Sequence, residues 1–106
     1  MRGSTTRRLR ACEQGIALAP QYAHGWSLKA TALGDAGRYD EALAAAQQAA
    51  TLDPADAGAW NVQGIVLYHL GRYEEALVAL DEALQRDPQT VPTQQALRAT
   101  LQAFDR

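Results

Sequence analysis

The chain has 106 residues, of which 47% are hydrophobic and 21% are charged, and its formal net charge is −2; this suffices for one small domain with a buried core. No stretch approaches the roughly twenty apolar residues that cross a membrane, and no apolar segment follows the Arg-rich start as in a signal peptide, so we expect a cytoplasmic protein with no membrane partner. Four Arg and no acid give the first ten residues a charge of +4. Without interleaved aromatic residues, these Arg do not build a groove that follows phosphates, so no nucleic-acid partner is expected.

The first segment, residues 1–6, is expected to be a disordered leader or the remnant of a tag. Residues 7–20 follow as one helix, roughly 7–18, with Pro20 placed where a helix must stop. The apolar positions of this helix are Leu9, Cys12, Gly15, Ile16 and Leu18. The repeat described next projects backwards onto this segment and makes it a partial repeat, a second helix without its first.

A repeat of thirty-four residues governs the middle of the chain. Residues 23–56 and 57–90 align with thirteen identical positions, and Pro20, Pro54 and Pro88 recur at the same interval. A period in the thirties is typical of stacked helical units, because a single unit cannot bury its own apolar face.

Each unit divides into two helices at a Gly. The expected helices are roughly 23–36, 40–52, 57–70 and 74–86. Gly37 and Gly71 follow the first helix of each unit, where a left-handed residue ends a helix without steric cost. Asp56 and Thr90 are candidate N-caps for the helices that follow them. No alternating β-branched run and no hairpin dipeptide predicts a strand, so the expected fold class is all-α with about six antiparallel helices.

The last segment, residues 91–106, is expected to be a C-terminal capping helix at roughly 91–104. Its inward residues are expected to be Leu97, Leu101 and Phe104, and its outward residues Gln94, Gln95, Arg98 and Gln102. A polar outer face suits the end of a helical array.

The two complete units resemble the tetratricopeptide repeat. That family favours Trp, Leu, Gly or Ala, and Tyr along its first helix, a Gly-x-Tyr turn, and then Ala, an aromatic residue, Ala and a closing Pro. The matching positions are Trp26, Ala30, Leu33, Gly37, Tyr39, Ala42, Ala49 and Pro54 in 23–56, and Trp60, Gly64, Leu67, Gly71, Tyr73, Ala76, Ala83 and Pro88 in 57–90. Lys29 and Gln63 depart from the pattern, since the family usually has Leu there. The resemblance implies a right-handed α-solenoid in which small residues let neighbouring helices approach closely.

The resemblance also implies a non-catalytic module that binds a peptide segment of a partner protein in a concave groove lined by the first helices. Transferred position by position, the groove residues are His24, Ser27, Thr31, Asp35, Asn61, Ile65, Tyr68, His69, Gln95, Ala99 and Gln102. Relatives that hold a C-terminal carboxylate present Lys, Arg and Asn on this surface, and only Asn61 of that set occurs here. The groove is therefore expected to suit peptide backbone and apolar side chains.

The residues give little sign of catalysis. His24 and His69 have no Cys or carboxylate at zinc-ligand spacing, and Cys12 is the single cysteine. We therefore expect no metal, no cofactor and no enzymatic activity. The adjacent acids Glu74 and Glu75 are better explained as residues of a first helical turn than as a catalytic pair.

Two alternatives stay open. The chain could be a self-assembling structural fragment, a homo-oligomer formed through exposed terminal helices, because helix 7–18 lacks the partner that would cover Leu9, Cys12 and Ile16. Ten acids against three Arg give residues 35–87 a charge of −7, and this polarity could favour contacts between the ends of two molecules. The chain could also be the targeting part of a larger enzyme.

Overall fold

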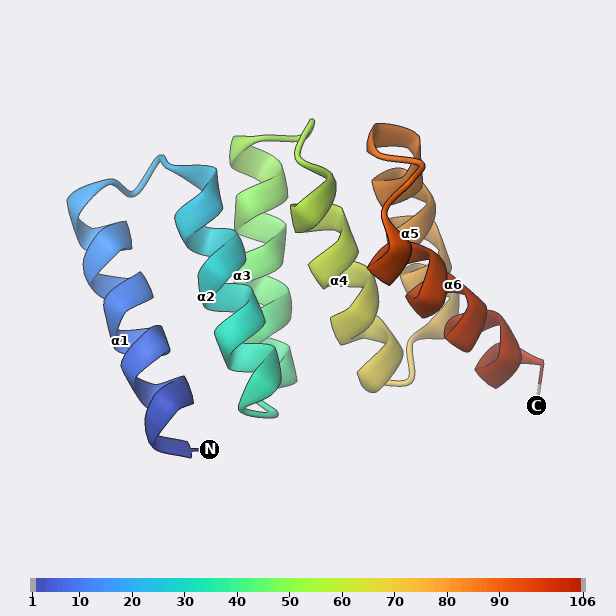
Figure 1. Cartoon of the computed structure of the whole chain (residues 1–106), viewed down its shortest axis with the longest axis horizontal. Helices are drawn as coiled ribbons and strands as arrows, with labels where there is room; N and C mark the ends of the chain where they lie inside the picture. The colour runs from blue at the N-terminus through green and yellow to red at the C-terminus, as the bar shows by residue number, and fades with distance from the viewer. Residues whose placement is uncertain (1, 106) are drawn as a thin grey trace.

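The computed structural model describes residues 2–105, with side chains from Thr5 onwards. Six helices make up this part of the chain: α1 (Arg2–Leu18), α2 (Ala23–Asp35), α3 (Tyr39–Leu52), α4 (Ala57–His69), α5 (Tyr73–Arg86) and α6 (Val91–Phe104). Each helix packs against the next one along the chain, with α3 and α5 behind the others in the view of Figure 1. The prediction of an all-α helical repeat is confirmed.

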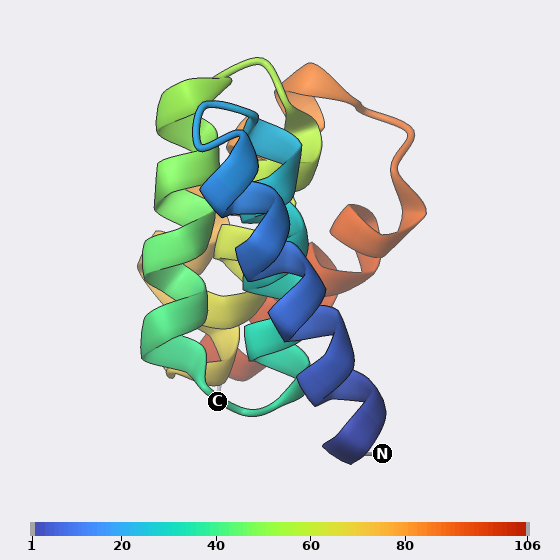
Figure 2. The same cartoon turned by 90° about the vertical axis from the view of Figure 1, so that its left-hand side faces the viewer.

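The helices form two rows that differ in their contacts. Within residues 2–105, α4 contacts both of the other first helices, α2 and α6, whereas the second helices α1, α3 and α5 form no contacts among themselves. Figure 2, which views the molecule from the α1 end, shows α1 in front with α3 beside it. Because only the first helices lie close together, they occupy the inner side of the curved array.

The start of α1 differs from the prediction. The helix begins at Arg2, so the expected disordered leader is wrong for residues 2–6, and Met1 lies outside the described residues. No Pro interrupts this stretch, and a guanidinium N–H of Arg8 donates to Thr5 Oγ1 at 3.4 Å and to Asp35 of α2 at 3.0 Å. The helix therefore continues towards the N-terminus and is tied to its neighbour.

The apolar face of α1 is narrower than predicted. Leu9 packs against the hydrophobic core, and Ile16 lies 3.5 Å from the place where a Cβ on Gly25 of α2 would stand. Gly15 and Leu18 are exposed instead. Among the residues that the structure describes, helix α1 contacts α2 alone, so only one side of it is covered.

The turns within the repeats follow the predicted chemistry. Gly37 and Gly71 adopt φ angles of 78° and 79°, the left-handed conformation that ends a helix. Asp56 caps α4 by accepting a hydrogen bond from the Gly58 N–H at 2.9 Å. Thr90 forms no such cap on α6, because its hydroxyl is buried without a hydrogen-bond partner.

Small residues allow the helices to approach closely, as predicted. The repeated alanines are completely buried: Ala30, Ala42, Ala49, Ala76 and Ala83. A Cβ added at Gly64 of α4 would lie 2.5 Å from Cγ of Leu80 in α5, which is closer than carbon atoms can stand. Helices α4 and α5 therefore pack with no room for a side chain at Gly64.

A side-chain hydrogen bond to the preceding Pro recurs at the start of each first helix. The indole N–H of Trp26 donates to the carbonyl oxygen of Pro20 at 2.8 Å, and Trp60 donates to Pro54 at 2.9 Å. At the next position of the period, the amide of Gln94 donates to Pro88 at 2.8 Å. This hydrogen bond fixes each first helix to the turn before it, and it is kept where Gln replaces Trp.

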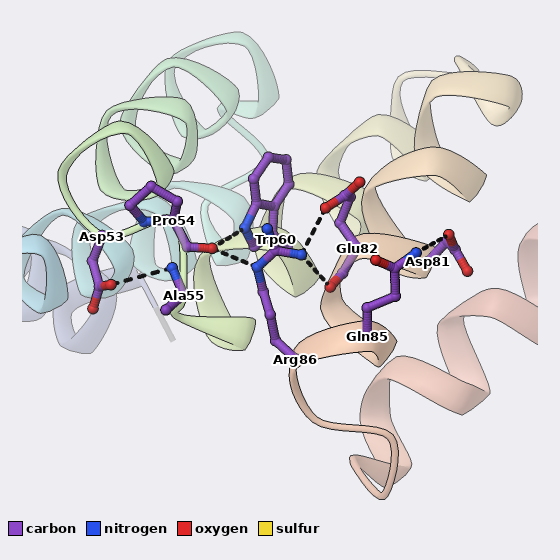
Figure 3. A network of polar contacts seen from close by, with 8 residues as sticks. All are labelled: Asp53, Pro54, Ala55, Trp60, Asp81, Glu82, Gln85 and Arg86. Atoms are coloured by element: carbon purple, nitrogen blue, oxygen red, sulfur yellow. Dashed lines mark hydrogen bonds and ion pairs between the residues drawn. The ribbon is translucent and has the colours of Figure 1, made fainter.

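A side chain from α5 reinforces the hydrogen bond between Trp60 and Pro54 (Figure 3). The Arg86 guanidinium lies 4.8 Å from the centre of the Trp60 ring and donates to the Pro54 carbonyl oxygen as well. Its Nη1 also donates to the Glu82 carboxylate at 2.6 Å. Arg86 therefore links α5 to the turn of the preceding unit.

The buried face of α6 is rotated from the one predicted, although Gln94, Gln95, Arg98 and Gln102 are exposed as expected. Thr93 and Thr100 are completely buried, whereas Leu101 and Phe104 are 51% and 49% exposed. Thr93 stands thirty-four residues after the buried Ala59 of α4, so α6 packs on the preceding unit through the same face as α4. The face with Leu101 is the one that a following second helix would cover, and no helix among residues 2–105 does so.

Candidate peptide-binding groove

A hollow of about 230 Å3 lies between the first helices α2 and α4. Its lining combines an apolar wall with polar side chains and consists of Ala30, Thr31, Gly34, Asp35, Tyr39, Asn61, Val62, Ile65, Val66 and His69. The structure thus brings together five of the side chains that the sequence placed in the groove: Thr31, Asp35, Asn61, Ile65 and His69.

Two aromatic rings form one wall of this hollow. The rings of Tyr39 and His69 are stacked, with centres 5.0 Å apart and planes 8° from parallel. Tyr39 follows the turn after α2 and His69 ends α4, so the stack links the two repeats. The sequence marked Tyr39 as a structural residue of the Gly-x-Tyr turn and did not place it in the groove.

The polar groups of the hollow are partly committed to neighbours. Asn61 Oδ1 accepts a hydrogen bond from Thr93 of α6 at 2.8 Å, which leaves its amide N–H groups for another acceptor. The Thr31 hydroxyl donates to the Ser27 carbonyl oxygen at 3.1 Å, so its lone pairs can accept. These groups can pair with the backbone of an extended peptide.

The charge of the hollow is acidic. Asp35 is its only charged lining residue, and its carboxylate pairs with Arg8 of α1 at 3.0 Å. Both side chains are half exposed, so this ion pair contributes at most about 1 kcal/mol. No Lys or Arg lines the hollow.

The other predicted groove residues lie elsewhere. Ser27 is buried, with a hydroxyl that has no hydrogen-bond partner, so its placement as an accessible groove residue is wrong. His24 lines a separate shallow hollow beside the turn between α3 and α4. Ala99 is half buried, and Gln95 and Gln102 are exposed on α6.

Tyr68 also lies outside the hollow. Its side chain is half buried and packs against the hydrophobic core, with its ring 5.8 Å from that of Tyr73 and 5.3 Å from that of His69. The position expected to offer an aromatic ring to a peptide therefore supports the fold.

The two departures from the repeat pattern both lie beside a Trp. Lys29 Nζ is 5.5 Å from the centre of the Trp26 ring, within the range of a cation–π contact. Gln63 is buried, and it lines a shallow hollow together with Trp60. Polar side chains at this position thus pack beside the indole rings.

Two equivalent ion pairs lie at the starts of α3 and α5. Arg38 and Arg72 hydrogen-bond to Glu41 and Glu75, and these bonds lower the pKa of each carboxyl below its ordinary value.

Within residues 2–105, no three His, Cys, Asp or Glu side chains gather as a metal site would require. None of the helices described has both the length and the apolar character to cross a membrane.

Comparison with solved structures finds close matches to the fold. The first TPR domain of Spaghetti (RPAP3), solved with the HSP90 peptide SRMEEVD, superposes with a TM-score of 0.92 at 19% identity, over 99% of this chain and 83% of that one. The TPR2B domain of yeast Sti1, in its complex with pHsp70, gives a TM-score of 0.80 at 26% identity, over 98% of this chain and 82% of that one.

A third match belongs to an enzyme. The O-GlcNAc transferase of Thermobaculum terrenum gives a TM-score of 0.89 at 27% identity, over 93% of this chain but only 19% of the transferase. No curated protein sequence matches the chain.

The family assignment rests on the sequence of the repeats as well as on the fold. A sequence model described as the tetratricopeptide repeat matches residues 27–90, which is more than half of the chain. The chain therefore belongs to the tetratricopeptide repeat family.

Proposed function

We propose that this chain is a non-catalytic protein-interaction module that binds a peptide segment of a partner protein between α2 and α4. The observation that carries this proposal is the hollow with an apolar wall around Ile65 and with hydrogen-bonding groups on Thr31 and Asn61. Such a mixture suits a peptide that inserts one apolar side chain and pairs its backbone with the polar groups. The RPAP3 and Sti1 domains, which have the same fold, are described with HSP90 and Hsp70 ligands.

The chemistry of the hollow defines the class of peptide. Asp35 is its only charged lining residue, so an acidic C-terminal segment such as SRMEEVD has no cation to pair with in this hollow. An uncharged or basic segment with one aliphatic or aromatic side chain fits better, because a basic group can compete with the half-exposed Arg8 for Asp35 while the apolar group contacts Ile65.

The test is a selection from a random peptide library displayed on phage, followed by calorimetric titration of the enriched peptides. Ile65→Asp should weaken binding by about 1–3 kcal/mol, which is roughly fivefold to 150-fold. The control is Val78→Asp, a change at an exposed residue of α5 that should leave binding unchanged. SRMEEVD serves as the acidic control and should not bind.

Several outcomes would contradict the proposal. If no peptide is enriched, the chain is not a peptide-binding module. If Val78→Asp removes binding and Ile65→Asp does not, the partner uses the outer side of the array. Saturable binding of SRMEEVD would show that the charge argument from Asp35 is wrong.

The similarity to O-GlcNAc transferase favours a second role, as the targeting part of a larger enzyme. In that protein the matching region is about a fifth of the chain. We also propose a cytoplasmic location, in keeping with the free thiol of Cys12, the single cysteine of the chain.

A further inference from the structure

One face of α6 is an exposed apolar surface, whereas the equivalent face of α4 is buried. Leu67 of α4 is 4% exposed, whereas Leu101, thirty-four residues later in α6, is 51% exposed. Phe104 is 49% exposed, and Leu97 is half buried. These three residues recur at the spacing of one helical face, so α6 presents a continuous apolar stripe.

A cation stands beside this stripe. Arg98 lies between Leu97 and Leu101 on α6, is exposed, and forms no ion pair with any residue in the described part of the chain. Its equivalent in α4 is Gly64, where a Cβ would already collide with Leu80 of the covering helix α5. A helix that covers α6 must therefore make room for Arg98 and must also neutralise it, since a buried unpaired charge is costly.

A second copy of this chain does not meet that requirement. If the array continued from one molecule to the next, α1 would cover α6 as α5 covers α4. The period then places Arg8 and Cys12 where Ala76 and Leu80 stand in α5. Arg8 would face Arg98, so two cations would meet at the closest approach of the helices, and this repulsion opposes stacking.

We propose that the stripe of Leu97, Leu101 and Phe104, with Arg98 at its edge, is a docking surface for an amphipathic helix of a partner protein. The partner helix takes the position that a second helix following α6 would occupy, and it places an Asp or Glu opposite Arg98. The charge of Arg98 and the apolar residues around it define this partner. The surface is separate from the hollow between α2 and α4, so the module has two binding sites.

Helix α5 supplies a direct probe, because it already covers the equivalent face of α4. Three peptides with the sequence of Tyr73–Arg86 are made, with acetylated and amidated ends: one unchanged, one with Leu80→Glu and one with Leu80→Lys. They are titrated into the full chain by fluorescence anisotropy. The Glu peptide should bind about tenfold more tightly than the Lys peptide, since attraction to Arg98 replaces repulsion.

Variants of the chain separate the docking surface from nonspecific binding. Arg98→Glu should reverse the order of affinity, so that the Lys peptide binds more tightly than the Glu peptide. Leu101→Asp should remove binding of both peptides. Arg7→Glu, an equal charge change on the exposed side of α1, should leave the order unchanged. Circular dichroism checks that each variant stays helical, which is expected because Leu101 and Arg98 are both exposed.

Three results would overturn the proposal. Equal affinities of the Glu and Lys peptides for the unmodified chain would show that Arg98 does not select the partner. No saturable binding of any peptide at millimolar concentration would show that the stripe is not a docking surface. Dimerisation in sedimentation experiments that Leu101→Asp removes would assign the stripe to a second copy of the chain.

Discussion

Replacing Gly64 by Ala tests whether the spacing between α4 and α5 is as close as the structure indicates. Exchanging Gly for Ala inside a helix normally stabilises it by about 1 kcal/mol. At Gly64, however, the new methyl group would lie 2.5 Å from Cγ and Cδ2 of Leu80, which is itself completely buried and can move only by displacing its neighbours. Overpacking of this kind costs about 1–3 kcal/mol.

Gly15 of α1 provides the matched control, because no atom would lie within 4 Å of a Cβ added there. The helical preference for Ala is common to both sites, so the difference between Gly15→Ala and Gly64→Ala isolates the steric cost. We expect Gly64→Ala to be about 1–3 kcal/mol less stable than Gly15→Ala in urea denaturation followed by circular dichroism. A shift of this size corresponds to roughly 4–24 °C in the melting temperature of a domain of this length.

Leu80→Ala provides the second arm of the experiment. In that background the methyl group added at Gly64 meets no obstacle, so Gly64→Ala should no longer be destabilising. If Gly64→Ala stabilises the unmodified chain as much as Gly15→Ala does, the close approach of α4 and α5 is refuted.

Two further predictions concern the side chains of Trp60 and Glu75. Trp60→Ala should lower the free energy of unfolding by about 3 kcal/mol, near the low end for Trp because the ring is only half buried. Trp60→Phe should lower it by only about 1 kcal/mol, because it removes the hydrogen bond to Pro54 and keeps an aromatic ring. Equal losses for the two variants in urea titrations would contradict this. Arg72 lowers the pKa of the Glu75 carboxyl, so the pair stabilises the fold above the ordinary pKa of Glu, about 4.3, and loses this effect as the pH falls through the lower folded value. Glu75→Gln should therefore be less stable than the unmodified chain at pH 7 and equally stable at about pH 2, as measured by urea midpoints; an unchanged difference at pH 2 would show that the Glu75 charge is not responsible.

The sequence predicted those features that depend on local chemistry and on the period. Gly37 and Gly71 end helices because only their own backbone conformation is involved, and Asp56 caps α4 through a bond two residues away. The small residues at Ala30 and Gly64 were also found, since a repeated small residue at one helical position indicates close packing.

The failures concern residues whose environment depends on a neighbouring unit. Leu101 has the same character as Leu67, but it is exposed because α6 lacks a covering second helix within the described residues. Ser27 has the polarity of a groove residue, yet it is buried. Amphipathic spacing identifies the faces of a helix, but it does not indicate which face has a partner.

The location of the hollow has a simple cause in the sequence. Gly34 lines the hollow at α2, whereas Tyr68 occupies the equivalent position of α4 and fills that space with a ring packed against the core. A Cβ at Gly34 would lie 3.9 Å from Val66, an ordinary contact, so a side chain there is tolerated by the backbone. Gly34→Tyr should therefore keep the fold, as judged by an unchanged or higher melting temperature, and weaken the peptides selected for the hollow by at least tenfold. Gly34→Ala, which adds only one methyl group, should retain most of the affinity. If Gly34→Tyr folds and binds these peptides unchanged, the absence of a side chain at position 34 is not what creates the binding site.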